Sequence, residues 1–160
     1  MGEDFTALVR SLADTPAQLK RLLQSISTEQ LRTRDADQFS ALENICHLRD
    51  IEIEGYGERI KRILDEKEPS LPDLDGAQLA IQRDYNNGDL DSAFAAFSTA
   101  RQLNLSLVRD LAAEQLARKG NLEGVGSISL RSLLEMMYEH DLGHIDELKL
   151  ISRRTSSAAI

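Results

Sequence analysis

Residues 129–153 read SLRSLLEMMYEHDLGHIDELKLISR, and this stretch decides the fold class. Its leucine, isoleucine and methionine residues recur three and four positions apart, which is typical of one face of an α-helix. At about 100° of rotation per residue, His140 and His144 fall in the middle of that apolar stripe, with Leu133 and Leu148 beside them. Two imidazoles in such a place lose their hydration, so their ring nitrogens need partners inside the protein.

The rest of the chain is also rich in helix-forming residues. Only three prolines and nine glycines interrupt the 160 residues, and no β-branched run alternates as a strand does. We therefore predict an all-α fold in one domain over residues 1–160. The predicted long helices cover 15–26, 40–67, 89–119 and 129–153, with 4–13 as a preceding helical piece or a kinked extension of the first helix.

Local signals set these boundaries. Thr15-Pro16 is typical of a helix start, and Ser40 with Glu43 forms a capping box. The acidic stretch DEKEPSLPDLDG at 65–76 predicts a solvated crossover between helices two and three, too long for a tight hairpin. A short helical piece at 77–86 ends at an Asn-Asn-Gly break. Lys119-Gly120 predicts a helix C-cap, the following GNLEGVGSIS a loop, and residues 153–160 a frayed tail.

Charge and composition exclude several classes of function. The formal net charge is −8, so the average field repels a nucleic-acid backbone. No apolar run approaches the roughly 20 residues that span a bilayer, and the acidic start does not resemble a secretory signal. The single cysteine excludes an internal disulfide and fits a reducing compartment. We expect a cytoplasmic protein that binds neither nucleic acid nor membrane.

The three histidines are the candidate metal ligands. His140 and His144 are one helical turn apart and could ligate one ion, although buried histidines bonded to carboxylates would also explain the pair. His47 lies mid-way along the second predicted helix, in ENICHLRDIE at 43–52. If the two helices face each other, three imidazoles form a set with an open coordination position. Zinc, nickel and iron(II) all accept such ligands.

The same residues resemble a known family. Ser40 followed by HLRDIE at 47–52, and HDLGH at 140–144, are similar to the motifs of the DinB-like metal-dependent four-helix-bundle superfamily. That superfamily includes bacterial thiol transferases of the bacillithiol-dependent type. The resemblance covers nearly the whole chain. It implies an up-down-down-up bundle with a long crossover between helices two and three, and a divalent metal (Zn, Ni, Fe or Mn) held by the three histidines.

Two positions depart from the family pattern. Phe39 replaces the tryptophan that often precedes the capping serine, and Glu147 replaces a glutamine three residues after the last ligand. Glu147 falls on the ligand-facing side of its helix, where it could be a fourth ligand, a general base or a residue that orients a ligand. Asp50 could accept an imidazole N–H or belong to a solvated face. We assign Glu147 and Asp50 as the candidate catalytic residues.

Two functions follow from this interpretation. The first is a metal-dependent enzyme that activates a low-molecular-weight thiol or a water molecule, for thiol transfer to or hydrolysis of a small-molecule substrate. The second is a non-catalytic metal-binding stress or interaction protein. The resemblance also implies a homodimer. Arg59, Arg83 and Arg101 could bind an anionic thiol, but surface ion pairing is the simpler expectation for them.

Overall fold

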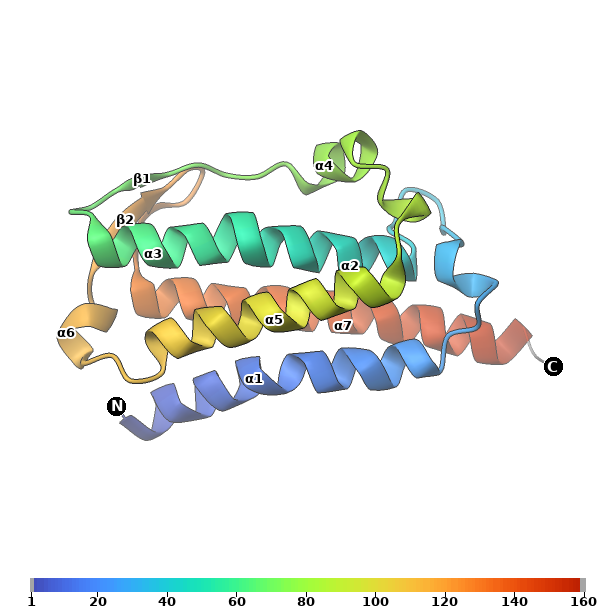
Figure 1. The fold of residues 1–160 in the computed structure, drawn as a ribbon, viewed down its shortest axis with the longest axis horizontal. Coiled ribbons are helices and arrows are strands. Elements are labelled where there is room, and N and C mark those ends of the chain that lie inside the picture. Colours follow the sequence, from blue (N-terminus) through green and yellow to red (C-terminus); the bar gives the residue numbers. More distant parts are fainter. Residues whose placement is uncertain (1, 159–160) are drawn as a thin grey trace.

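In the computed structural model, which describes residues 2–158, four long helical segments form a bundle (Figure 1). Side chains of Glu3 and of residues 155–158 are not described. The segments are α1 (Gly2–Gln24), α2 (Ala41–Asp50) with η2 (Ile51–Gly57) and α3 (Glu58–Asp65), α5 (Leu90–Val108), and α7 (Leu130–Ala158). Figure 1 shows α1 and α7 running one way and α2–α3 and α5 the other, with α1 packed on α7 and α2 on α5. The predicted up-down-down-up bundle is confirmed.

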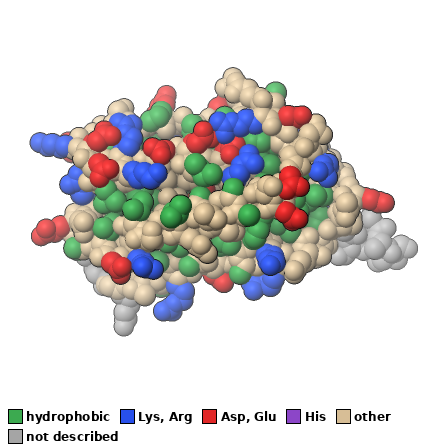
Figure 2. All heavy atoms as spheres, in the orientation of Figure 1, with side chains coloured by type: hydrophobic (Ala, Val, Ile, Leu, Met, Phe, Trp, Pro, Cys, Tyr) green, Lys and Arg blue, Asp and Glu red, His purple; other side chains and the backbone are tan. Residues whose placement is uncertain are grey.

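The long crossover between α3 and α5 is confirmed. It contains β1 (Ser70–Leu71), α4 (Gly76–Gln82) and η3 (Tyr85–Asn87), and it runs along the α2–α3 segment (Figure 1). The α1–α2 connection holds only η1 (Gln30–Arg32). None of the helices in the described part of the chain is both long and apolar enough to cross a membrane. On the face drawn in Figure 2, acidic and basic side chains are interspersed.

The region after α5 differs from the prediction. The helix ends at Val108 instead of 119 and is followed by α6 (Ala113–Leu116), β2 (Lys119–Leu122) and β3 (Gly126–Ser129). Strand β2 pairs antiparallel with β3 and parallel with β1. Gly120 is therefore a strand residue rather than a helix cap, and a Cβ there would lie 2.8 Å from Leu71 Cδ1. Strands of two to four residues are too short for sequence alternation to reveal them.

The first helix contains its proline instead of starting at it. Helix α1 runs without interruption from Gly2 to Gln24, with Pro16 inside it. Proline has no N–H to donate to the carbonyl four residues earlier. The freed Leu12 carbonyl accepts a hydrogen bond of 2.9 Å from Arg101 Nη1 on α5 instead. The proline is tolerated because a side chain from another helix replaces the missing donor.

Arg101 is the centre of a buried ionic network. Its guanidinium, 1% exposed, pairs with Glu52 at 2.8 Å and with Asp141 at 2.7 Å, and Asp141 also accepts from Thr15 Oγ1. With the Leu12 carbonyl, these carboxylates engage every nitrogen of the side chain. The expectation of a surface ion pair for Arg101 was wrong, because its partners come from three other helices. The network ties η2, α5, α7 and α1 together at the level of His140.

The middle of the second long segment is a π-helix. In η2 the wider turn leaves the Glu52 carbonyl to accept from Asn104 Nδ2, at 3.2 Å. A Cβ at Gly57 would lie 2.9 Å from that carbonyl oxygen and 3.0 Å from Asn104 Oδ1, so only glycine fits. Single π-turns inside α-helices are frequent at functional sites. Here the π-turn begins four residues after His47.

The hydrophobic core is divided into two clusters at the level of the histidines. One buried cluster includes Leu12, Ile60 and Met137, and the other includes Leu19, Phe97 and Ile145. Along α7 the first cluster ends at Met137 and the second begins at Ile145, and the buried residues between them, Asp141 and His144, are polar. The bundle thus has a polar layer at mid-height, and two of its histidines belong to that layer.

Candidate metal centre

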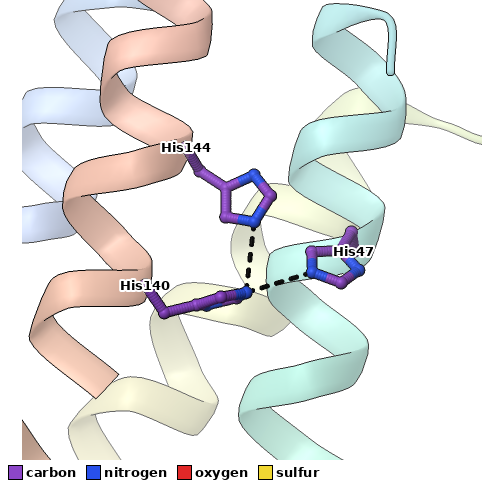
Figure 3. A group of neighbouring side chains, drawn as sticks. All are labelled: His47, His140 and His144. Carbon is purple, nitrogen blue, oxygen red and sulfur yellow. Dashed lines mark hydrogen bonds between the residues drawn. The ribbon is translucent and has the colours of Figure 1, made fainter. Parts of the chain in front are cut away.

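The three histidines converge on one point between α2 and α7. His140 and His144 extend from successive turns of α7, and His47 faces them from α2 (Figure 3). His140 Nε2 lies 3.1 Å from the Nε2 atoms of both His47 and His144. One potential ligand atom from each of the three lies within 4.8 Å of the others. The structure therefore brings together all three residues that the sequence singled out.

Hydrogen bonding alone does not satisfy this arrangement. A neutral imidazole nitrogen carries either one proton or one lone pair. His140 Nε2 faces two other Nε2 atoms, so it can make only one good bond where the geometry offers two. A divalent cation would accept one lone pair from each ring. The residues present thus fit a three-histidine ion site with a fourth position left for a ligand.

Burial keeps two of the rings in the form that binds metal. Loss of hydration, together with the neighbouring imidazoles, lowers the pKa of His47 to about 4 and that of His140 to about 3. Both rings are therefore neutral at pH 7. Within residues 2–158, no carboxylate bonds to any of the three Nε2 atoms. Carboxylates therefore do not account for the Nε2 atoms of this cluster.

These low pKa values predict acid-sensitive stability in the metal-free protein. A histidine of ordinary pKa near 6.5 takes up a proton in the unfolded chain, while folded His47 and His140 resist it down to about 4 and 3. The free energy of unfolding should therefore decrease as the pH is lowered, by up to about 4 kcal/mol from pH 7.5 to pH 5. Urea unfolding in chelator across that range measures it.

Between pH 7.5 and 5, the pH dependence of stability reports mainly on the histidine cluster. The chain has only three histidines, and carboxyl groups with pKa near 4 contribute little above pH 5. A His140→Leu variant should lose part of the pH dependence. A flat wild-type profile between pH 7.5 and 5 would show that the folded rings titrate as exposed histidines do.

Asn44 fixes the orientation of His144. The His144 Nδ1 atom lies 2.6 Å from Asn44 Oδ1, and Asn44 Nδ2 donates to the Ser40 carbonyl at 3.0 Å. Because Nδ2 is used as a donor, Oδ1 is the acceptor, and the ring proton of His144 belongs on Nδ1. Its Nε2 lone pair then faces the other histidines. The only sequence signal for Asn44 was a polar residue one turn before His47.

We predict that Asn44→Leu weakens metal binding by about 10- to 100-fold, because the ring loses its orienting acceptor. Asn44→Asp is the matched control, since a carboxylate oxygen still accepts from Nδ1. Competition titrations against a chromogenic chelator measure both affinities. Equal losses in the two variants would mean that the side chain acts through packing and not as an acceptor.

Glu147 lies outside the ligand cluster. Its Oε2 atom is 3.6 Å from His144 Nδ1, the nitrogen on the other side of the ring from Nε2, and its side chain is 44% exposed. The neighbouring His144 lowers the pKa of Glu147, so it is ionised at neutral pH. Of the three roles considered for it, this position corresponds to orienting a ligand. Its assignment as a catalytic residue stays a prediction.

Asp50 is occupied by other partners. It accepts hydrogen bonds from Tyr85 and Arg83 on the crossover and from Arg49 on its own helix. Burial opposes its ionisation, but these donors outweigh burial and lower the pKa of Asp50. Asp50 therefore connects the crossover to α2 by hydrogen bonds, one helical turn after His47. A direct catalytic role for it also remains a prediction.

The sequence predicted a solvated crossover, but part of the crossover covers the histidine cluster. Its α4 begins at Gly76, where a Cβ would lie 2.5 Å from His47 Cε1 and 2.8 Å from Nδ1. That Nδ1 atom is buried without a hydrogen-bond partner. Only glycine allows the crossover to cover His47 so closely. Gly76 was not among the sequence candidates, because the contact spans 29 positions of chain.

A cavity of about 290 Å³ opens onto the cluster. His47 and His140 line it, and so do residues 123–125 of the β2–β3 turn. Tyr56, Arg59, Asp73 and Met136 complete most of the remaining wall. A small molecule in this space would therefore contact two of the three histidines.

With this geometry established, comparisons with known proteins place the chain. A family model described as the DinB superfamily matches residues 11–148. The chain belongs to the DinB superfamily. Among solved structures, it is similar to YfiT from Bacillus subtilis, with a TM-score of 0.89 and 23% identity over 96% of this chain and 89% of that one. YfiT is described as "a probable metal-dependent hydrolase with an unusual four-helix bundle topology".

No curated protein matches the chain. The likeness to YfiT confirms the fold, and at this identity it supports no more than the fold. DinB-superfamily membership agrees with the resemblance found in the two histidine motifs.

Proposed function

We propose that the chain is a metal-dependent enzyme that hydrolyses a small molecule at a divalent ion held by His47, His140 and His144. The observation that supports this most directly is the convergence of three Nε2 atoms, 3.1 Å apart in two pairs, at the wall of a cavity. The description of YfiT as a probable metal-dependent hydrolase agrees with it.

A divalent ion in this site would supply a water or thiol nucleophile at neutral pH, by lowering its pKa. The protein residues divide the remaining tasks. His47 and His140 stay neutral and keep their lone pairs available. Asn44 holds His144 in the matching tautomer. Tyr56 and Met136 line the cavity with largely apolar surface, which favours exclusion of bulk water around a bound substrate.

The test is made on chelator-stripped protein reloaded with cobalt(II), zinc, nickel, manganese or iron(II). Cobalt absorption should show a site with an exchangeable ligand, and a panel of esters and amides should be hydrolysed only by loaded protein. The same panel of electrophiles with added thiols separates hydrolysis from thiol transfer. A cobalt spectrum insensitive to every added small ligand would contradict an open site, and would favour a non-catalytic metal-binding protein.

A further inference from the structure

Arg59 on α3 is a buried cation in the wall of the same cavity. It is 7% exposed, as buried as a core residue, yet it lies beside a space that a small molecule can enter. Its guanidinium is held in place by Pro72, whose carbonyl accepts from Nη2 at 3.2 Å, and by the Tyr56 ring, whose centroid is 5.6 Å from Cζ. The side chain is therefore positioned before any ligand arrives.

Most of its hydrogen-bonding capacity is unused. Within the described residues, Nε is buried without a partner, and no hydrogen bond forms from Nη1. Arg101 is the internal comparison, because it is also buried and bonds through every nitrogen. A buried guanidinium with free donors is unfavourable unless another group completes it. Arg59 thus differs from the arginine that only stabilises the bundle.

Its one carboxylate neighbour is a weak partner. Asp73 Oδ1 lies 3.8 Å from Nη2, beyond hydrogen-bonding distance, and the Asp73 side chain is 71% exposed. Exposed ion pairs of this kind contribute little. A carboxylate inside the cavity could instead form the short, paired bonds that a guanidinium makes with such a group.

Tyr56 connects this cation to the histidines. The centroid of its ring lies 5.6 Å from Arg59 Cζ and 5.9 Å from the centroid of the His140 ring. Arg59 and His140 therefore lie near the same aromatic ring, and all three residues line the same cavity. A ligand anchored at Arg59 could reach His140 within that cavity.

We propose that Arg59 binds the carboxylate of a small substrate and so sets its orientation toward the three histidines. This inference rests on the proposed function, since it names the substrate class of that site. A single negative charge matches the single guanidinium. Asp73 and Glu123, which also line the cavity, repel anions, and this repulsion is smaller for a carboxylate with one charge than for a doubly charged phosphate. The volume of about 290 Å³ favours a small molecule of few carbons.

The test uses probes with a thiol at one end and a carboxylate or its amide at the other. These are 3-mercaptopropionate, 4-mercaptobutyrate and 6-mercaptohexanoate, each compared with its amide. Binding to cobalt-loaded protein is followed by the thiolate-to-cobalt absorption band. For at least one chain length, the acid should bind about tenfold or more tightly than the amide. The preference should vanish in Arg59→Gln, survive in part in Arg59→Lys, and be unchanged in Arg62→Gln, which alters an exposed arginine of the same helix.

A second measurement is independent of metal. Butyrate, which carries one carboxylate, should raise the melting temperature of chelator-stripped wild type more than that of Arg59→Gln, and inorganic phosphate should raise it less than butyrate does. Equal binding of acids and amides at every length, or a preference that persists in Arg59→Gln, would overturn the role of Arg59 while the metal site stands. If no probe alters the cobalt spectrum, the open metal site itself is refuted and this inference fails with it.

Discussion

Replacement of Arg101 by alanine is expected to lower the free energy of unfolding by about 3–5 kcal/mol. The change leaves Glu52 and Asp141 buried without their counter-charge, and breaking a buried ion pair from one side has a cost of this size. It also leaves the Leu12 carbonyl, already deprived of a backbone donor by Pro16, without any partner. Urea unfolding at pH 7.5 measures the loss.

Two variants control that result. Arg62→Ala removes a solvent-accessible pair with Glu66 and one hydrogen bond to the Ser70 carbonyl, and it should cost clearly less than Arg101→Ala, about 1 kcal/mol. The triple change Arg101→Met, Glu52→Gln and Asp141→Asn removes all three charges together, and it should recover part of the loss. If Arg101→Ala costs no more than Arg62→Ala, the network does not hold the polar layer together.

Replacement of His144 by alanine is expected to abolish the stabilisation that metal confers on the wild-type protein. A ligand present at about 1,000 times its dissociation constant stabilises the folded state by about 4 kcal/mol. His144 supplies one of the three converging nitrogens, and with two histidines left the affinity should fall by orders of magnitude. Melting curves with and without zinc or nickel measure the difference.

Cys46→Ala is the matched control for that variant. Cys46 is adjacent to His47 and buried, but its sulfur lies 3.8 Å from the Tyr85 carbonyl. Burial raises the pKa of this thiol, which disfavours the thiolate that a metal needs. Its replacement should leave the metal-induced rise in melting temperature intact. If the rise in melting temperature persists in His144→Ala and disappears in Cys46→Ala, the assignment of the metal ligands is wrong.

The histidine cluster was predictable because helical geometry is local. The rotation per residue places His140 and His144 on one face whatever surrounds them, and the capping box at Ser40 begins helix α2 seven residues before His47. The same geometry does not decide the role of Glu147. Its angle on the wheel places it near the ligand stripe, but the wheel does not tell which nitrogen of His144 it approaches.

Other features depend on contacts that are distant in sequence. The burial of Arg101 requires Glu52 and Asp141 from other helices, and the sequence around residue 101 does not indicate these partners. Pro16 looked like a helix start because the donor that replaces its missing N–H is 85 positions away. The contact between Gly76 and His47 likewise arises only when the crossover folds over α2. Local patterns thus predicted the helices and ligands, and tertiary contacts determined what supports them.

The most direct test is zinc K-edge X-ray absorption on protein loaded with one equivalent of zinc. Three imidazole ligands and one further light ligand are predicted, at about 2.0 Å from the metal. His144→Ala should lose one imidazole contribution from the outer-shell scattering. A sulfur scatterer near 2.3 Å, or a spectrum unchanged by His144→Ala, would contradict a metal centre formed by His47, His140 and His144.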